Sequence, residues 1–92
     1  MSQFDWDPAK AEANLRRHGV SFEEADEAIV HPLAAEEPDI EHSGSENRLR
    51  ITGWSSVGRL LVVIVSLSSP RGRIISARRA TKRERHAYET RP

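Results

Sequence analysis

Arginine is the residue type whose number and placement most strongly suggest chemistry in this 92-residue chain, where it outnumbers lysine twelve to two. A guanidinium group pairs with phosphate oxygens through two parallel hydrogen bonds and keeps its charge at any ordinary pH. Eleven of the fourteen bases lie in residues 47–92, together with only two acidic residues. This pattern favours a binding site for a phosphate-containing partner.

The formal net charge of zero hides two oppositely charged regions. Residues 23–46 carry nine acidic residues and neither lysine nor arginine, whereas residues 47–92 have an excess of nine positive charges. A domain of this size has a radius of gyration of about 12–13 Å, and physiological salt screens charges over about 8 Å. Two opposed patches would therefore act separately, and a polyanionic partner is not excluded. Alternatively, the two halves pack together and neutralise each other.

Alternation with a period of two begins at Asn47, which predicts a strand with one wet face. Arg48, Arg50, Thr52 and Trp54 alternate there with Leu49, Ile51 and Gly53. A sheet face with cations and an aromatic ring can hold a phosphodiester backbone and stack a base, although it can also be an ordinary solvated face. The predicted RNA contacts are Arg17, Arg50, Trp54, Arg73, Arg79 and Lys82.

Cleavage of a bound RNA would use the 2′-hydroxyl of the RNA as nucleophile. The enzyme must remove its proton, stabilise the charge that develops at phosphorus, and protonate the leaving 5′-oxygen. Arginine can stabilise the charge, and His18, His42 and Glu46 are the candidates for proton transfer. As structural alternatives, His18 stabilises the C-terminal end of its helix, and His42 anchors a loop.

Several other classes of protein have no support in the sequence. Without cysteine there is no disulfide framework or thiolate site. The four histidines form no HxxxH or HExxH pair, and no phosphate-binding glycine motif is present, so neither a metal nor a cofactor is predicted. The longest apolar run, 60–65, is too short to span a membrane. The N-terminus does not resemble a signal peptide, so we expect a cytoplasmic protein.

Two helices are predicted before the strands. Asp7 and Pro8 begin the first, and Gly19 ends it. Its apolar face is predicted to hold Ala11, Leu15 and His18. Ser21 begins the second helix, in a capping box with Glu24, and His31-Pro32 ends it. Its predicted buried stripe is Phe22, Ala25 and Ile29.

The remaining elements complete an α+β domain over residues 1–92. Residues 3–6 could form a short edge strand, and 33–46 a short strand followed by a loop at 43–45. Strands are predicted over 47–54, 60–67 and 73–79, the second buried on both faces. Thr81 and Glu84 form a capping box that begins a short C-terminal helix ending near Tyr88.

Three stretches of the chain together resemble the BrnT toxin family of type II toxin–antitoxin systems. They are FDWDPAKAEANLRRHGVSFEEA (4–25), DIEHSGSENRLRITGWSSVGRLLVVIV (39–65) and RIISARRATKRERHAY (73–88). The resemblance implies a RelE-like fold, a small twisted antiparallel sheet with two N-terminal helices and a short C-terminal helix. It also implies a ribonuclease that arrests growth by cutting RNA. The implied partner is a BrnA-type antitoxin, which forms a hetero-oligomer with the toxin and carries it to operator DNA.

The resemblance also points to site residues. The positions that match the polar signature of the family are His18, His42, Glu46, Arg48, Arg73 and Arg78. By chemistry, Arg48 and Arg78 would stabilise transition-state charge, and His42 or Glu46 would transfer protons. One position departs from the family, which often has Lys-His-Gly where this chain has Arg17-His18-Gly19. An arginine cannot serve as a base, so a catalytic lysine at that position would be lost here.

A second hypothesis is a non-catalytic module that binds a partner and RNA, or acts as a co-repressor. It rests on the lack of an unmistakable acid–base pair in the sequence. A third is a structural protein whose charges only neutralise each other. RNA affinity that weakens with salt argues against the third hypothesis, because phosphate contacts release counterions.

Overall fold

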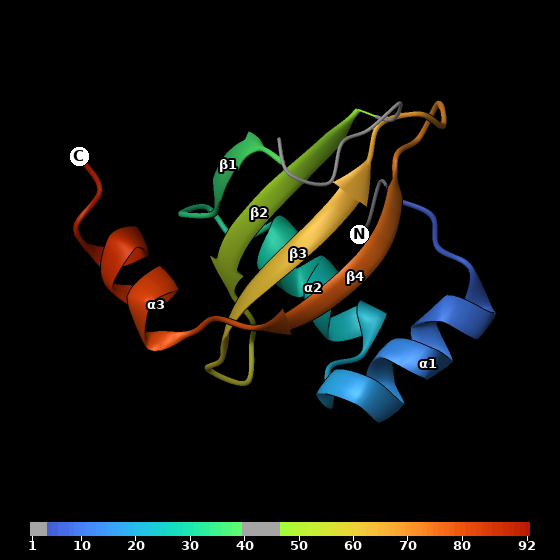
Figure 1. Ribbon diagram of the computed structural model, residues 1–92, viewed down its shortest axis with the longest axis horizontal. Coiled ribbons are helices and arrows are strands. Elements are labelled where there is room, and N and C mark those ends of the chain that lie inside the picture. The colour runs from blue at the N-terminus through green and yellow to red at the C-terminus, as the bar shows by residue number, and fades with distance from the viewer. Residues whose placement is uncertain (1–3, 40–46) are drawn as a thin grey trace.

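Three helices and four strands follow one another in the computed structural model, which describes residues 4–39 and 47–92 (Figure 1). Helices α1 (Pro8–His18) and α2 (Phe22–Ile29) come first. The strands β1 (Ala35–Pro38), β2 (Arg48–Trp54), β3 (Leu60–Ser66) and β4 (Arg73–Arg79) follow, and α3 (Lys82–Glu89) is last. The strands form one antiparallel sheet in the order β1-β2-β3-β4, which confirms the predicted α+β class.

The ends of the helices follow the predicted capping residues. Asp7 accepts a hydrogen bond from the N–H of Ala9 at 3.0 Å. Gly19 has a φ of 68°, a left-handed conformation that favours glycine, and its N–H closes the last turn on the carbonyl of Leu15. Ser21 caps α2 as predicted, but the carboxylate of Glu24 binds Arg59 and Ser55. Only half of that predicted capping box is therefore present.

The buried face of α1 differs from the prediction, because its centre is polar. Leu15 is half exposed, and the buried residue of the helix is Asn14. The amide nitrogen of Asn14 donates to the carbonyls of Val20 at 2.9 Å and Ala77 at 2.8 Å, and its oxygen accepts from the N–H of Ala77 at 3.1 Å. The spacing of apolar residues could not predict this face, because the side chain that joins α1 to β4 is a polar amide, that of Asn14.

The core lies between one face of the sheet and the helices α1 and α2. In Figure 1, α2 lies behind the sheet. Gly53 of β2 is under the end of α2, where an added Cβ would be 2.3 Å from the backbone oxygen of Ala28. The close approach of helix and strand therefore requires glycine at this position. The buried core residues are Val20, Phe22, Ala25, Ala28, Ile51, Leu61, Val63, Val65, Ile74 and Ala77.

The N-terminal segment does not form the predicted edge strand in its described part. Asp5 makes a single parallel bridge to Arg73 of β4. Its N–H donates to the carbonyl of Gly72 at 3.0 Å, and its carbonyl accepts from the N–H of Ile74 at 2.9 Å. These two bonds fasten the start of β4 to the N-terminal segment. Residue 3 and the predicted loop at 43–45 lie outside the described residues.

Candidate active site

The face of the sheet opposite α2, here called the outer face, carries the predicted arginines in adjacent rows. Antiparallel register aligns Arg50 with Ile64 and Ser76, and Thr52 with Val62 and Arg78. A third row aligns Arg48 with Ser66 and Arg73. Residues directly opposite each other in antiparallel strands point to the same face of the sheet. Arg48, Arg50, Arg73 and Arg78 therefore all belong to one surface.

A bulge in β4 makes this arrangement possible. Ile64 pairs with Ser76, but Val65 pairs with Ile74, so Ile75 is an extra residue on β4. An extra residue shifts the alternation of side chains by one. Arg73 and Arg78 are five positions apart and would point to opposite faces of a regular strand. The bulge brings both to the outer face.

A hollow of about 450 Å³, here called the central hollow, lies among these residues. Arg48, Arg50 and Arg78 line it together with the apolar residues Val62, Ile64 and Ile75. Two carboxylates, Asp39 and Glu84, also line it. The hollow thus combines three guanidinium groups, which can bind a phosphate, with two carboxylates that can pair with them.

Arg78 and Arg50 each make an ion pair with a carboxylate of the described residues. The two terminal nitrogens of Arg78 donate to the two carboxylate oxygens of Glu84 at 2.7 and 2.8 Å. Arg50 donates to one oxygen of Glu37 on β1 at 2.6 and 3.1 Å. Each carboxylate occupies the donors that a phosphate would use. A bound phosphate must therefore compete with Glu84 for Arg78 and with Glu37 for Arg50.

Two smaller hollows adjoin the central hollow, and Ile75 lines all three. The first, here called the edge hollow, has Lys10, Arg48 and Arg73 in its lining. The second, here called the helix hollow, lies between α1 and β4 and is lined by Lys10, Arg17 and His18. Positive side chains thus continue from the outer face around the edge strand β4 to α1.

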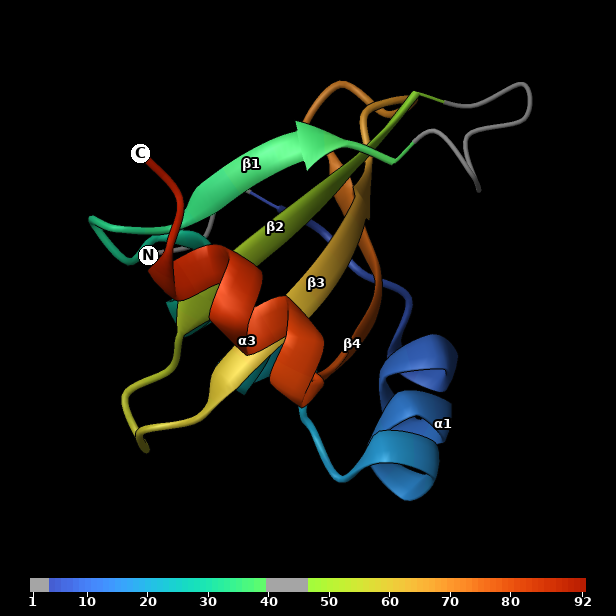
Figure 2. The same cartoon turned by 60° about the vertical axis from the view of Figure 1, so that its left-hand side comes forward.

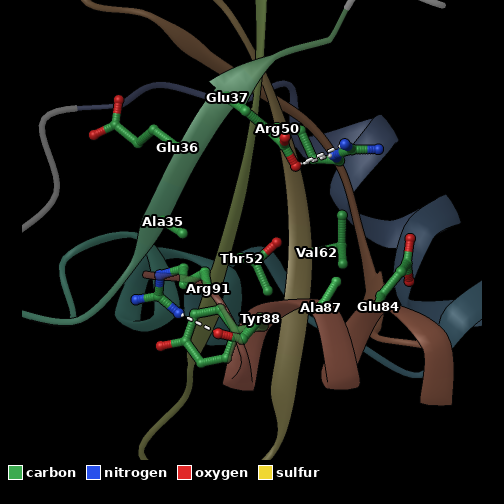
Figure 3. Close-up of a pocket in the computed structure, with 10 residues that line it drawn as sticks. All are labelled: Ala35, Glu36, Glu37, Arg50, Thr52, Val62, Glu84, Ala87, Tyr88 and Arg91. Carbon is green, nitrogen blue, oxygen red and sulfur yellow. Dashed lines mark hydrogen bonds and ion pairs between the residues drawn. The ribbon is translucent and has the colours of Figure 1, made fainter.

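Helix α3 begins beside the central hollow, which its residue Glu84 helps to line. It lies to one side of the sheet in Figure 1 and in front of β2 and β3 in the view of Figure 2. A further hollow of about 320 Å³ separates α3 from β1 and β2 (Figure 3). Tyr88 donates through its hydroxyl to the carbonyl of Leu33 at 2.8 Å, and Arg91 donates to the same oxygen at 2.6 Å. No residue of α3 is buried. Polar side-chain contacts to the turn before β1 and to Arg78 of β4 therefore hold this helix in place.

Comparison with known proteins decides the family. The model of a family described as ribonuclease toxin, BrnT, of type II toxin–antitoxin system matches residues 6–84. The chain belongs to the BrnT family. No curated protein matches the chain. A type II system pairs a protein toxin with an antitoxin, so membership of the BrnT family implies an antitoxin partner for this chain.

The matched region of the BrnT family contains every described residue that lines the three connected hollows. It ends at Glu84, which forms the ion pair with Arg78. Tyr88 of α3 and Arg91, which follows the helix, lie outside the match. The described lining of the central hollow thus lies wholly within the matched region, and the second half of α3 lies outside it.

The structure brings many of the predicted site residues of this BrnT chain together and separates others. His18, Arg17, Arg48, Arg50, Arg73 and Arg78 line the connected hollows. Trp54 does not, and its ring is covered by the guanidinium of Arg85 at 4.9 Å from the centroid. Arg79 and Lys82 lie at the end of β4 and the start of α3, outside the hollows. His42 and Glu46 lie outside the described residues.

Sequence reasoning missed Lys10, Asp39 and Glu84 as lining residues. Glu84 was visible only as a helix-capping residue, and it fills that role as well, since its carboxylate accepts from the N–H of Thr81 at 2.9 Å. Lys10 lies early in α1, far along the chain from the basic strands. Asp39 follows β1 in the acidic stretch. Only the fold places these three beside the arginines.

Within residues 4–39 and 47–92, no three or more His, Cys, Asp or Glu side chains are grouped so as to hold a metal ion. Over the same ranges, no helix has the length and apolar character needed to cross a membrane.

From the Arg78–Glu84 pair we predict how the stability of this BrnT protein depends on pH. The hydrogen bonds from Arg78 lower the pKa of Glu84 from 4.5 to about 2. A lowered pKa in the folded state stabilises the fold above pH 4.5, and this contribution is lost as the pH falls toward 2. At pH 6, the free energy of unfolding of the wild type should be larger than that of Glu84→Gln. The difference between the two proteins should shrink below pH 4.5.

Urea unfolding of both proteins between pH 7 and 3 measures this difference. Glutamine is a suitable replacement because it keeps the helix-capping position occupied. A difference that stays constant down to pH 3 would show that the ion pair does not contribute in the folded protein.

Proposed function

We propose that this protein is an endoribonuclease toxin that cuts RNA in the central hollow and thereby arrests growth. The observation that carries the proposal is the convergence of Arg48, Arg50 and Arg78 on one hollow of the outer face. Membership of a ribonuclease toxin family supports the same conclusion from independent evidence. Guanidinium donors held in place before the reaction are suited to stabilise the charge that develops on a phosphate.

The proposed reaction is an acid–base transfer within the RNA that needs no metal ion. The 2′-oxygen attacks the adjacent phosphorus as a base removes its proton, and the bond from phosphorus to the 5′-oxygen breaks. An acid protonates that oxygen, so the products are a 2′,3′-cyclic phosphate and a 5′-hydroxyl end. Arg48 and Arg78 bind the non-bridging phosphate oxygens and stabilise the charge of the transition state.

We assign the proton transfers to His42 or Glu46, with His18 as the third candidate. Residues 42 and 46 stand in the sequence between Asp39 and Arg48, and both of these flanking residues line the central hollow. His18 lines the helix hollow next to it. Histidine changes its charge near neutral pH, which suits a group that both accepts and returns a proton.

The other predicted contacts would bind RNA on either side of the reaction centre. Arg17 and Arg73 line the two hollows that adjoin the centre. Arg50 lines the centre itself, and Lys82 lies beyond it at the start of α3. Arg79 is aligned with the core residue Leu61, so its side chain points away from the outer face. The guanidinium of Arg85 covers the ring of Trp54 in the free protein, so Trp54 can stack on a base only after Arg85 has moved away.

We further propose that the antitoxin is of the BrnA type and neutralises this protein in a hetero-oligomer in the cytoplasm. The support is the pairing of toxin and antitoxin in type II systems. Operator DNA would be contacted only through the antitoxin. The toxin itself would supply no DNA-reading element in this arrangement.

Expression of the gene with and without its neighbour, followed by mapping of RNA ends, tests the proposal. Induction of the chain alone should stop growth and produce new RNA fragments with 5′-hydroxyl ends. Co-expression of the neighbouring gene should restore growth and remove the fragments. Normal growth with confirmed soluble protein would argue against a toxin, and RNA binding without fragments would favour the non-catalytic binding module.

A further inference from the structure

The edge hollow, of about 240 Å³, differs from the central hollow in the charge of its lining. Lys10 of α1 and Arg48 and Arg73 of the sheet contribute positive charge. Ser66, Ser68 and Ser69, at the end of β3 and in the loop after it, contribute hydroxyl groups. Among the described residues, no carboxylate lines it, whereas Asp39 and Glu84 line the central hollow. The charged groups that the described residues bring to the edge hollow therefore all attract an anion.

Two cations of the edge hollow are available to a ligand. Lys10 and Arg73 are exposed and form no side-chain ion pair with the described residues. The nearby carboxylate of Asp5 is paired with Arg71, with 3.4 Å between the charged atoms. Lys10 and Arg73 therefore offer donors without first having to release an internal carboxylate.

A buried hydroxyl gives a second indication of a ligand. The oxygen of Ser69 is buried and has no hydrogen-bond partner. Buried polar atoms are almost always hydrogen-bonded, so an unpaired one at a hollow indicates a missing partner. A phosphate oxygen is a suitable partner because a hydroxyl can donate to it.

The loop that carries these serines is held in place by its surroundings. The N–H of Gly72 donates to the carbonyl of Ser69 at 3.1 Å, and Gly72 has a φ of 76°. A Cβ at Gly72 would be 2.6 Å from the ring of Phe4, so the ring packs directly on the backbone there. The bridge between Asp5 and Arg73 fixes the same region. The edge hollow is thus built from fixed backbone before any ligand arrives.

We propose that Lys10, Arg73 and the serine hydroxyls form a subsite for the RNA phosphate next to the one that is cleaved. Arg48 and Ile75 line both the edge hollow and the central hollow, so the two share a wall. Two successive phosphates of one strand can therefore occupy them together. The subsite rests on the proposed cleavage at Arg48 and Arg78, and it adds a binding role for Lys10 that the sequence did not indicate.

The subsite can be tested first with inorganic phosphate, independently of RNA cleavage. Titration into isotope-labelled wild-type protein should shift the amide resonances of Ser68 and Ser69. The variants Lys10→Gln and Arg73→Gln should each weaken this binding by about tenfold, as expected for loss of a charge-assisted hydrogen bond. Arg83→Gln removes an exposed arginine that does not line the edge hollow and serves as the matched control.

The second arm uses 2′-O-methyl dinucleotides, which lack the nucleophile, with and without a terminal phosphate at the 5′ or the 3′ end. In the wild type, one of the two terminal phosphates should tighten binding by about tenfold. Lys10→Gln and Arg73→Gln should remove this gain, whereas Arg83→Gln should retain it. With longer strands, each of the two variants should reduce the salt dependence of binding by about 0.7 in log–log slope.

The outcomes separate the subsite from the proposed function. No shift at the serines, or a gain that survives in both variants, would overturn the subsite. Binding of inorganic phosphate without any gain from a terminal phosphate would overturn its role in RNA binding and leave a site for a free anion. If wild type cuts no RNA but the phosphate gain depends on Lys10 and Arg73, the subsite stands and cleavage is refuted.

Discussion

The double substitution Arg48→Ala and Arg78→Ala should reduce RNA cleavage by about a thousandfold and abolish growth arrest. Loss of one fixed donor to a developing charge costs about 10²–10³ in rate, and effects of donors on one phosphate are not independent. Arg48 and Arg78 line opposite parts of the central hollow, on β2 and β4. Single-turnover cleavage of a short RNA, with purified protein, measures the loss.

Two comparisons make this prediction specific. Arg78→Lys keeps the charge but loses the two parallel hydrogen bonds, so its rate should lie between wild type and Arg78→Ala. Arg83→Ala removes an exposed arginine of α3 outside the hollow and should cleave like wild type. Circular dichroism should show that all variants are folded. A folded double variant that cleaves as fast as wild type would place the reaction elsewhere on the molecule.

Asn14→Ala should lower the free energy of unfolding by about 3 kcal/mol, the largest loss of stability that we expect from one substitution. The substitution removes three hydrogen bonds and leaves the backbone of Val20 and Ala77 without partners in a buried position. Small domains are stable by only roughly 5–15 kcal/mol, so the loss is a large fraction of the total. Urea unfolding monitored by circular dichroism measures it.

The direction of the effect distinguishes packing from local helix preference. Alanine is the better helix former by up to about 0.7 kcal/mol, so a helix that depended on local preference would be stabilised. Arg16→Ala is the matched control on the same helix, because it removes only an exposed pair with Glu12. Its effect should be within about 0.5 kcal/mol of zero. Equal effects at positions 14 and 16 would contradict a tertiary role for Asn14.

The two predictions meet at β4. Asn14 fastens α1 to Ala77, one position before Arg78. The same helix brings Lys10, Arg17 and His18 to the edge of β4. Displacement of α1 would therefore separate these side chains from the central hollow without changing any of them. Reduced cleavage by a folded Asn14 variant is consistent with this positioning role.

The sequence alone predicted the three helices, the three long strands and the wet face of β2. Local signals are sufficient there: Asp7-Pro8 begins α1, Gly19 ends it, and alternation from Arg48 to Trp54 separates charged from apolar side chains. The capping box at Thr81 and Glu84 was equally local and is present. Each of these features depends on residues within a few positions of one another, so its physical cause is visible in the order of the residues.

The composition of the site was decided by the tertiary structure. Strict alternation puts Arg73 and Arg78 on opposite faces, and only the bulge at Ile75, set by pairing with β3, brings them together. The partner of Arg78 is a capping glutamate of the next helix. Lys10 reaches the edge hollow because a buried amide at Asn14 ties α1 to β4. Strand register, ion pairs and helix docking join residues distant in sequence, and local periodicity carries no information about them.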